Sequence, residues 1–174
     1  MKSVRALVAA LLLAVPLAAC GDGKSSAPAM EEAMVDQATL AKFVALLPAA
    51  PKGFTAAPAT TVTGKERSVV AQTYSAPTTD SFSVEITFSN ADVAKFQKML
   101  DEPKEANKAA AEINQIAGRN ALSFSSPVVT NAKYLMIVSP SRYVTVTPLF
   151  GDTLKPIMRS VFEQIDFDAI AAQK

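Results

Sequence analysis

The residue types that carry most enzyme chemistry are scarce in this chain. Its 174 residues include no histidine and a single cysteine, Cys20. The commonest general base and transition-metal ligand is therefore missing, so acid–base chemistry would fall to carboxylate, lysine, serine or tyrosine groups. Asp166 and Asp168 are spaced like the first two ligands of a calcium loop, but the glycine and the further acid of such a loop do not follow. We expect no catalytic residue, no metal site and no cofactor.

Motifs for nucleophilic catalysis and for phosphate binding are also missing. The sequence has no G-x-S-x-G elbow and no glycine-rich nucleotide loop. A serine–lysine pair that uses Ser68, Ser81 or Ser141 stays open, although no S-x-x-K motif supports it. The acidic residues between positions 101 and 105 alternate with lysines at helical spacing, which predicts ordinary surface ion pairs.

Arg119, Arg142 and Tyr143 are the remaining candidates for ligand binding. An arginine can recognise a phosphate or a carboxylate with two parallel hydrogen bonds. Arg119 follows Gly118 at an expected helix end, and Arg142 and Tyr143 open an expected strand after a turn. At such positions, capping of the last helix carbonyls or a surface charge at a strand end is the alternative role.

The N-terminal residues have the three-part layout of a secretory signal. Lys2 and Arg5 precede an apolar run of about ten residues, which is roughly half the length that spans a membrane. Small residues then lead to the segment Leu17-Ala18-Ala19-Cys20, which resembles the lipobox of bacterial prolipoproteins. The resemblance implies cleavage between Ala19 and Cys20, a diacylglycerol on the Cys20 thiol, and an acyl chain such as palmitate on the new amino terminus.

This resemblance divides the chain into a signal peptide (1–19), a lipidated cysteine with a flexible tether (20–30) and a single domain (31–174). The tether is expected to be flexible because its residues are small, polar and proline-containing. The domain would then face the periplasm from a membrane anchor. In Gram-negative lipoproteins an aspartate directly after the cysteine favours the inner membrane; here Gly21 holds that position, which favours the outer membrane.

The charge of the mature chain excludes some partners. After the signal is removed, 15 basic and 16 acidic residues remain, and no basic stripe suggests nucleic acid. With Cys20 lipidated, no thiol is left for a disulfide. The remaining 155 residues are enough to bury one core.

Apolar periodicity indicates the elements of the first half of the domain. We expect a helix over 30–47, an irregular edge strand within 49–63, and strands over 66–74 and 81–88. The last of these alternates between an apolar face and a polar face, so one face should be buried. Ser89 and Asp92 fit a capping box at the start of the next helix, in which each side chain accepts a hydrogen bond from the other residue's backbone N–H.

The second half is expected to return to strands and to end in a helix. A second helix over 104–117, with a thin alanine-rich apolar side, would be closed by Gly118. Strands should follow around 122–124, over 134–138 and over 142–147, the last two joined by a hairpin. The strongest helical pattern covers 152–165.

Together these elements predict an α+β fold, an antiparallel sheet with flanking helices in the order α-β-β-β-α-α-β-β-β-α. This order resembles the Mog1/PsbP-like fold, whose families include small bacterial lipoproteins that mostly bind other proteins. The resemblance implies protein binding here as well.

The sequence therefore favours a non-enzymatic envelope lipoprotein whose domain binds an envelope protein. The alternative is a periplasmic carrier of an apolar or lipid ligand, since 49% of the residues are hydrophobic. A hydrolase without histidine would need two carboxylates within about 10 Å of each other in a cleft. The oligomeric state stays open.

Overall fold

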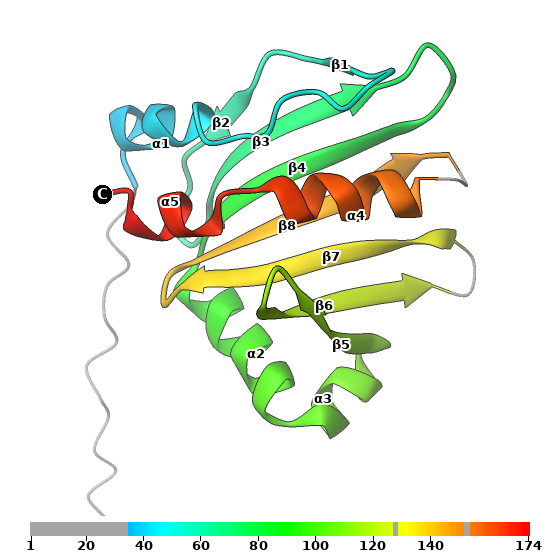
Figure 1. The fold of residues 1–174 in the computed structure, drawn as a ribbon. Coiled ribbons are helices and arrows are strands. Elements are labelled where there is room, and N and C mark those ends of the chain that lie inside the picture. The colour runs from blue at the N-terminus through cyan, green and yellow to red at the C-terminus, as the bar shows by residue number, and fades with distance from the viewer. Residues whose placement is uncertain (1–34, 127–128, 152–153) are drawn as a thin grey trace, which may run out of the picture. The chain divides into compact units, whose positions relative to one another are not determined.

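The computed structural model describes residues 35–126, 129–151 and 154–174, which form five helices and eight strands (Figure 1). Ala19, Cys20 and the tether lie outside the described residues. The helices are α1 (Gln37–Val44), α2 (Asn90–Asp101), α3 (Pro103–Lys108), α4 (Lys155–Gln164) and α5 (Phe167–Ala172). The strands are β1 (Thr55–Ala56), β2 (Thr60–Val62), β3 (Ser68–Ser75), β4 (Ser81–Phe88), β5 (Ala111–Ile116), β6 (Arg119–Ser126), β7 (Val129–Ser139) and β8 (Arg142–Phe150). Within those ranges no helix has both the length and the apolar character needed to cross a membrane.

All strands join one antiparallel sheet in the order β1-β3-β4-β8-β7-β6-β5, and β2 also pairs with β3. The α+β class with an antiparallel sheet and flanking helices is thus confirmed. The expected edge strand within 49–63 is divided into the short strands β1 and β2. The longest-range pairing is at the centre, where β4 lies beside β8.

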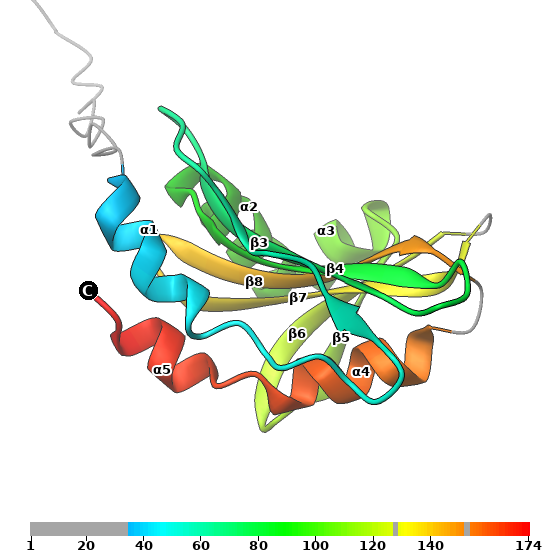
Figure 2. The same cartoon turned by 90° about the horizontal axis from the view of Figure 1, so that it is seen from above.

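Helices cover the sheet from both sides (Figure 2). α1, α4 and α5 lie on one face, and α2 and α3 lie on the other. The larger core lies under α1, α4 and α5. Because side chains alternate along a strand, the central strands give this core every second residue, as β4 does with Phe82, Val84, Ile86 and Phe88.

A smaller core fills the second face, between α2, α3 and strands β5 to β8. It is built from Val93, Met99, Ala106, Ala111, Leu122, Leu135 and Tyr143. The sequence predicts a polar second side for β4, yet Ser83 and Thr87 on that side are buried rather than in solvent. Neighbouring side chains therefore bury most of the second side of the strand, although its sequence pattern is typical of a half-exposed strand.

The capping box at the start of α2 forms only in part. The Ser89 hydroxyl accepts a hydrogen bond from the backbone N–H of Asp92 at 3.3 Å, as expected. The Ser89 N–H instead donates to the carbonyl of Ser141 at 2.9 Å, in the β7–β8 turn. The Asp92 carboxylate is therefore left to bind elsewhere.

The expected helix over 104–117 is wrong beyond Lys108. The chain leaves α3 through Ala110, which has a positive φ of 51°, and then runs as strand β5 beside β6. Ala117 and Gly118 connect the two strands with φ values of 50° and 73°, which are the positive angles of a type I′ hairpin turn. Gly118 thus closes a hairpin, and Arg119 begins a strand rather than following a helix.

The C-terminal residues form a helix that the periodicity of the sequence does not reveal. α5 has six residues, and Asp166 caps it by accepting the N–H of Ala169 at 2.9 Å. Phe167 and Ile170 bury this helix in the larger core.

Arg142 fastens α5 to the start of β8. Its Nη1 donates to the carbonyls of Ile170 at 2.7 Å and Gln173 at 2.8 Å, and its Nη2 donates to that of Ala171 at 3.2 Å. The guanidinium also lies over the rings of Phe43 and Phe88, 5.3 and 5.8 Å from their centroids. A cation bound to the last carbonyls of a helix is stabilising because these groups carry partial negative charge. Arg142 therefore holds the C-terminal helix against the core.

Replacing Arg142 by methionine should destabilise the protein by about 2 kcal/mol or more, because hydrogen bonds to a charged group are lost while the aliphatic stem is kept. Urea unfolding at constant m-value measures the effect. Arg159→Met is the matched control, since the ion pair of Arg159 with Glu163 is exposed and surface pairs contribute little. Equal losses in both variants would contradict the role of Arg142.

Candidate functional site

One region of the second sheet face has no helix packed over it and carries polar side chains. α2 and α3 pack against β5, β6, β7 and β8, whereas β3 and β4 extend beyond them (Figure 1). We call this region the polar face. It consists of Arg67, Val69, Ala71, Thr73, Ser83, Glu85, Thr87, Lys133, Thr145 and Thr147, together with Tyr143 at the edge that α2 covers.

The strand register fixes the positions of these residues. Glu85 on β4 lies opposite Ala71 on β3 and opposite Thr145 on β8. Ser83 lies in the next row, between Thr73 and Thr147. Opposite residues of antiparallel strands have Cβ atoms about 5 Å apart and point to the same side. The polar face is therefore positioned by the sheet itself and not by loops.

Glu85 is the central carboxylate of the polar face. Its Oε2 lies 3.7 Å from Nη2 of Arg67, and its Oε1 accepts a hydrogen bond from the Ser83 hydroxyl at 3.4 Å. The side chain of Arg67 is 49% exposed and that of Glu85 is 27% exposed. Pairs at this exposure contribute little to stability, so the pair mainly holds Glu85 in place.

Lys133 on β7 reaches the same region from the other side of β8. Burial lowers the pKa of its ammonium, and so does Arg67, while Glu85 and Asp92 raise it. Its ammonium has no hydrogen bond to any residue that the structure describes. Partial burial of a cation is costly unless its donors meet acceptors.

Tyr143 links the polar face to α2. Its hydroxyl donates to Oδ2 of Asp92 at 3.0 Å, which is the carboxylate that the capping box leaves unused. Burial, together with Asp92, raises the pKa of Tyr143 to about 12, although the nearby Thr87 hydroxyl acts in the opposite direction. The phenol is therefore protonated at neutral pH and can only donate to Asp92.

Two hydroxyl groups of the polar face are buried without a hydrogen-bond partner. Thr87 is 0% exposed and Thr145 is 1% exposed, and neither Oγ1 atom is in hydrogen-bonding geometry with another group. Thr87 lies near enough to Tyr143 to affect its pKa. Buried polar groups are nearly always paired, and a buried hydroxyl without a partner reduces the stability of the domain.

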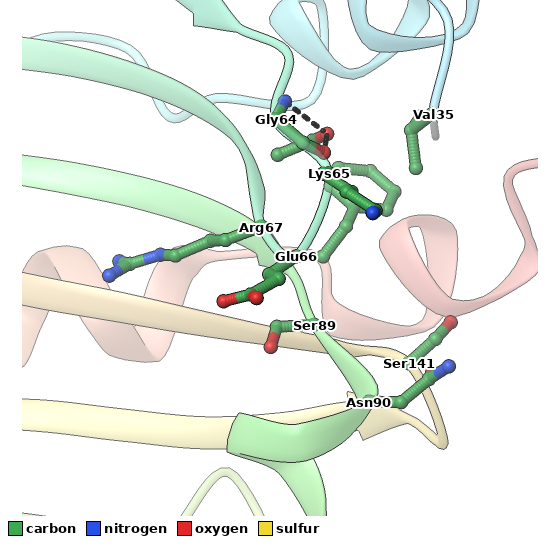
Figure 3. Close-up of a pocket in the computed structure, with 10 residues that line it drawn as sticks. Val35, Gly64, Lys65, Glu66, Arg67, Ser89, Asn90 and Ser141 are labelled. Carbon is green, nitrogen blue, oxygen red and sulfur yellow. Dashed lines mark hydrogen bonds between the residues drawn. The ribbon is translucent and has the colours of Figure 1, made fainter. Parts of the chain in front are cut away.

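A small pocket lies at the end of the sheet, between the β2–β3 loop and the start of α2 (Figure 3). Its volume is about 130 Å³ and it is open to solvent. Gly64 and Ser68 in its wall bond to each other, and Figure 3 shows the side chain of Arg67 pointing away from Ser89 and Asn90, along the sheet. No unpartnered buried polar atom among the described residues lines this pocket, which distinguishes it from the polar face.

An apolar groove of about 500 Å³ lies between α2 and the β7–β8 turn. Val93, Ala94, Ile137, Val138 and Pro140 give it most of its apolar lining. It is open to solvent, as the small pocket is. An enclosed apolar cavity would be expected of a lipid carrier, and neither of these two pockets is enclosed.

The three residues that the sequence offers for ligand binding do not come together. Arg142 and Tyr143 are adjacent in β8, so they point to opposite faces of the sheet, one toward α5 and the other toward α2. Arg119 pairs with Asp168 of α5. Of the three, only Tyr143 lies in the polar face.

The carboxylates singled out in the sequence have structural partners. Asp166 caps α5, Asp168 pairs with Arg119, and Glu105 pairs with Lys108. In the part of the chain that the structure describes, no group of three acidic, cysteine or histidine side chains is placed to hold a metal ion.

Sequence reasoning missed Lys133, Glu85 and Thr145. The polar side of strand 81–88 is the signal that could have found Glu85, because it places Ser83, Glu85 and Thr87 on one side of the strand. Their convergence, however, depends on pairing between β4, β8 and β7, which lie far apart in the sequence.

The sequence matches no protein-family model, and no curated protein and no solved structure matches the chain. The function must therefore be inferred from the geometry of the polar face.

Replacing Thr145 by valine should stabilise the free protein by about 1 kcal/mol, because an isosteric methyl group removes a buried hydroxyl that has no partner. Chemical unfolding measures the gain. Thr78→Val in the exposed β3–β4 turn is the control and should have no measurable effect. A loss of stability on Thr145→Val would mean that the hydroxyl is paired in the free protein.

The free energy of unfolding should fall as the pH rises from about 10 to 12. In the folded protein burial raises the pKa of Tyr143 and of Tyr74 to about 12, whereas an unfolded tyrosine ionises near pH 10. The unfolded state therefore loses protons first, which favours unfolding by up to about 1.4 kcal/mol per pH unit for each such tyrosine. Tyr143→Phe should reduce this slope in urea titrations, and an unchanged slope would contradict the burial of its phenol.

Proposed function

We propose that this chain is a bacterial envelope lipoprotein, anchored through Cys20 and facing the periplasm, whose α+β domain binds an envelope protein without catalysing a reaction. The observation that carries the proposal is the polar face. It places the half-buried Lys133, which has no hydrogen-bond acceptor among the described residues, on the same side of the sheet as the partly exposed pair of Arg67 and Glu85. The Arg67–Glu85 pair lies at the start of β3 and on β4, where no described helix packs over this side of the sheet.

The polar face is suited to binding because it is already in place. Its side chains stand on the four neighbouring strands β3, β4, β8 and β7, whose relative positions are fixed by backbone hydrogen bonds. Small side chains at Ala71, Thr73 and Ser83 form its floor on β3 and β4, so a partner can approach the backbone closely. Side chains on strands lose little conformational freedom when a partner binds, and this reduces the entropic cost of association.

The ionisable groups of the polar face favour binding over catalysis. Glu85 is paired with Arg67, and the protonated phenol of Tyr143 is paired with Asp92. A general base needs a pKa near the working pH and a free acceptor, and a phenol with a pKa of about 12 has neither at neutral pH. This supports a non-enzymatic role.

The alternative function, a carrier of an apolar or lipid ligand, would use the groove between α2 and the β7–β8 turn. An acyl chain in that open groove would stay partly in water and would gain only part of the free energy of burial. Protein binding at the polar face is therefore the better supported proposal.

The proposed anchor is compatible with a partner at some distance from the membrane. Fourteen residues lie between Cys20 and Val35, the first described residue. When fully extended, a segment of that length spans roughly 50 Å. The domain could therefore reach beyond the lipid headgroups.

Site-specific photocrosslinking in intact cells tests the proposal. A photoreactive residue at Thr73, in the polar face, should capture one discrete protein, whereas the same residue at the exposed Glu163 of α4 should not. Mass analysis of the captured chain should give a mature protein that begins at a lipidated Cys20. Equal capture from both positions, no capture at all, or an unmodified Cys20 would contradict the proposal.

A further inference from the structure

The sheet ends at β5, which is paired on one side only. Among the described residues β5 pairs with β6 alone, and it lies at the end of the strand order opposite β1 (Figure 1). We infer that this edge binds an extended segment of another protein, which joins the sheet as a further antiparallel strand. The inference goes beyond the proposed function, because β6 separates β5 from the strands of the polar face.

The backbone groups of alternate residues in β5 point away from β6. Ile116 pairs with Arg119 beside the two-residue turn, and residues that flank such a turn form a hydrogen-bonded pair. At the other end of the strand, the N–H of Ser125 donates to the carbonyl of Ala110 at 3.4 Å. The even-numbered residues of this stretch therefore bond to β6, and the odd-numbered ones direct their N–H and C=O groups outward. The outward-facing residues are Ala111, Ile113 and Gln115.

The edge at β5 lacks the features that usually prevent strand addition. The opposite edge carries β1 and β2, which are two and three residues long and have Pro58 between them. Short edge strands and proline block pairing with another chain. β5 has six residues, no proline and no register shift against β6. An edge of this kind is a template for another strand.

The side chains of β5 indicate what such a strand would carry. Ile113 lies opposite Leu122 on the side of the smaller core, yet it is 36% exposed. An apolar side chain directly opposite Ile113 would bury it, because opposite residues of antiparallel strands point to the same side. Glu112 is exposed on the other side of the sheet, where a basic side chain would complement its charge. The edge therefore suits a segment in which apolar and basic residues alternate.

The size of the edge favours a flexible segment over a second copy of the domain. Six residues of strand are about 20 Å long, and stable interfaces between proteins bury about 1,200 Å² or more. Two folded domains that met only along this strip would bury less. A flexible segment can also place its side chains against both sides of the sheet, beside Ile113 and Glu112.

A pair of labelled peptides tests strand addition on the full-length protein by fluorescence anisotropy. Both alternate valine and lysine, and one is N-methylated at every lysine while the other is N-methylated at every valine. If valine lies opposite Ile113, the valine N–H groups face β5 and the lysine N–H groups face away. The lysine-methylated peptide should therefore bind, and the valine-methylated peptide should bind at least roughly tenfold more weakly. Equal binding of the two, or binding of neither, would overturn the inference.

A matched pair of variants tests the edge itself. Gln115→Pro removes an outward N–H without removing a hydrogen bond to β6, and proline is tolerated on an edge strand in that position. It should weaken binding of the lysine-methylated peptide roughly tenfold or more. Gln115→Ala loses the same side-chain contact with Asn120 but keeps the N–H, so it should bind as the parent does. Equal affinities of the two variants would overturn the inference. Urea unfolding checks that both fold, and the peptide pair decides on the parent protein if Gln115→Pro does not.

Two further measurements identify the occupant. Light scattering should give a monomer for the parent protein, and a dimer that Gln115→Pro dissociates would overturn the assignment to another protein. A photoreactive residue at Glu112 in intact cells should capture a protein that Gln115→Pro no longer captures. Undiminished capture, or none from the parent, would contradict the inference, whereas capture from Thr73 tests the proposed function separately.

Discussion

The pairing of β4 with β8 is the constraint on which the other features of the domain depend. These two strands lie at the centre of the sheet, and their register puts Ile86 beside Val144 in the larger core and Glu85 beside Thr145 in the polar face. Because successive side chains alternate between faces, a shift of one residue would send every apolar side chain of β4 to the polar side. Both helical layers and the polar face therefore depend on one ladder of backbone hydrogen bonds.

Adjacent residues at the start of β8 hold the two helical layers in place. Arg142 points to one face and binds the last carbonyls of α5, while Tyr143 points to the other and binds Asp92 in the first turn of α2. In the sequence the two residues form an attractive pair for ligand binding. In the structure the thickness of the sheet separates them, since a strand turns consecutive side chains in opposite directions. Their proximity in sequence reflects their shared role in fastening helices.

Local patterns in the sequence predicted most of the strands, because alternation of apolar residues reports directly on a buried face. Strand 81–88 has the expected bounds, and α4 lies within the expected range 152–165. The helix expected over 104–117 failed because Ile113 and Ile116 are spaced as in a helix, while the pairing of β5 with β6 depends on a turn with two positive φ angles. The convergence of Lys133, Glu85 and Thr145 could not be predicted, since it arises from the pairing of strands that are far apart in the chain.

The central position of β8 also has a consequence for the order in which the chain can fold. β8 (Arg142–Phe150) lies between β4 and β7. The two halves of the sheet therefore cannot join until almost the whole polypeptide has been synthesised. Contacts of such long sequence separation form late and slow folding. A chain whose central strand comes last keeps the two halves of its sheet apart for most of its synthesis, and its hydrophobic strands must be kept from aggregating until then.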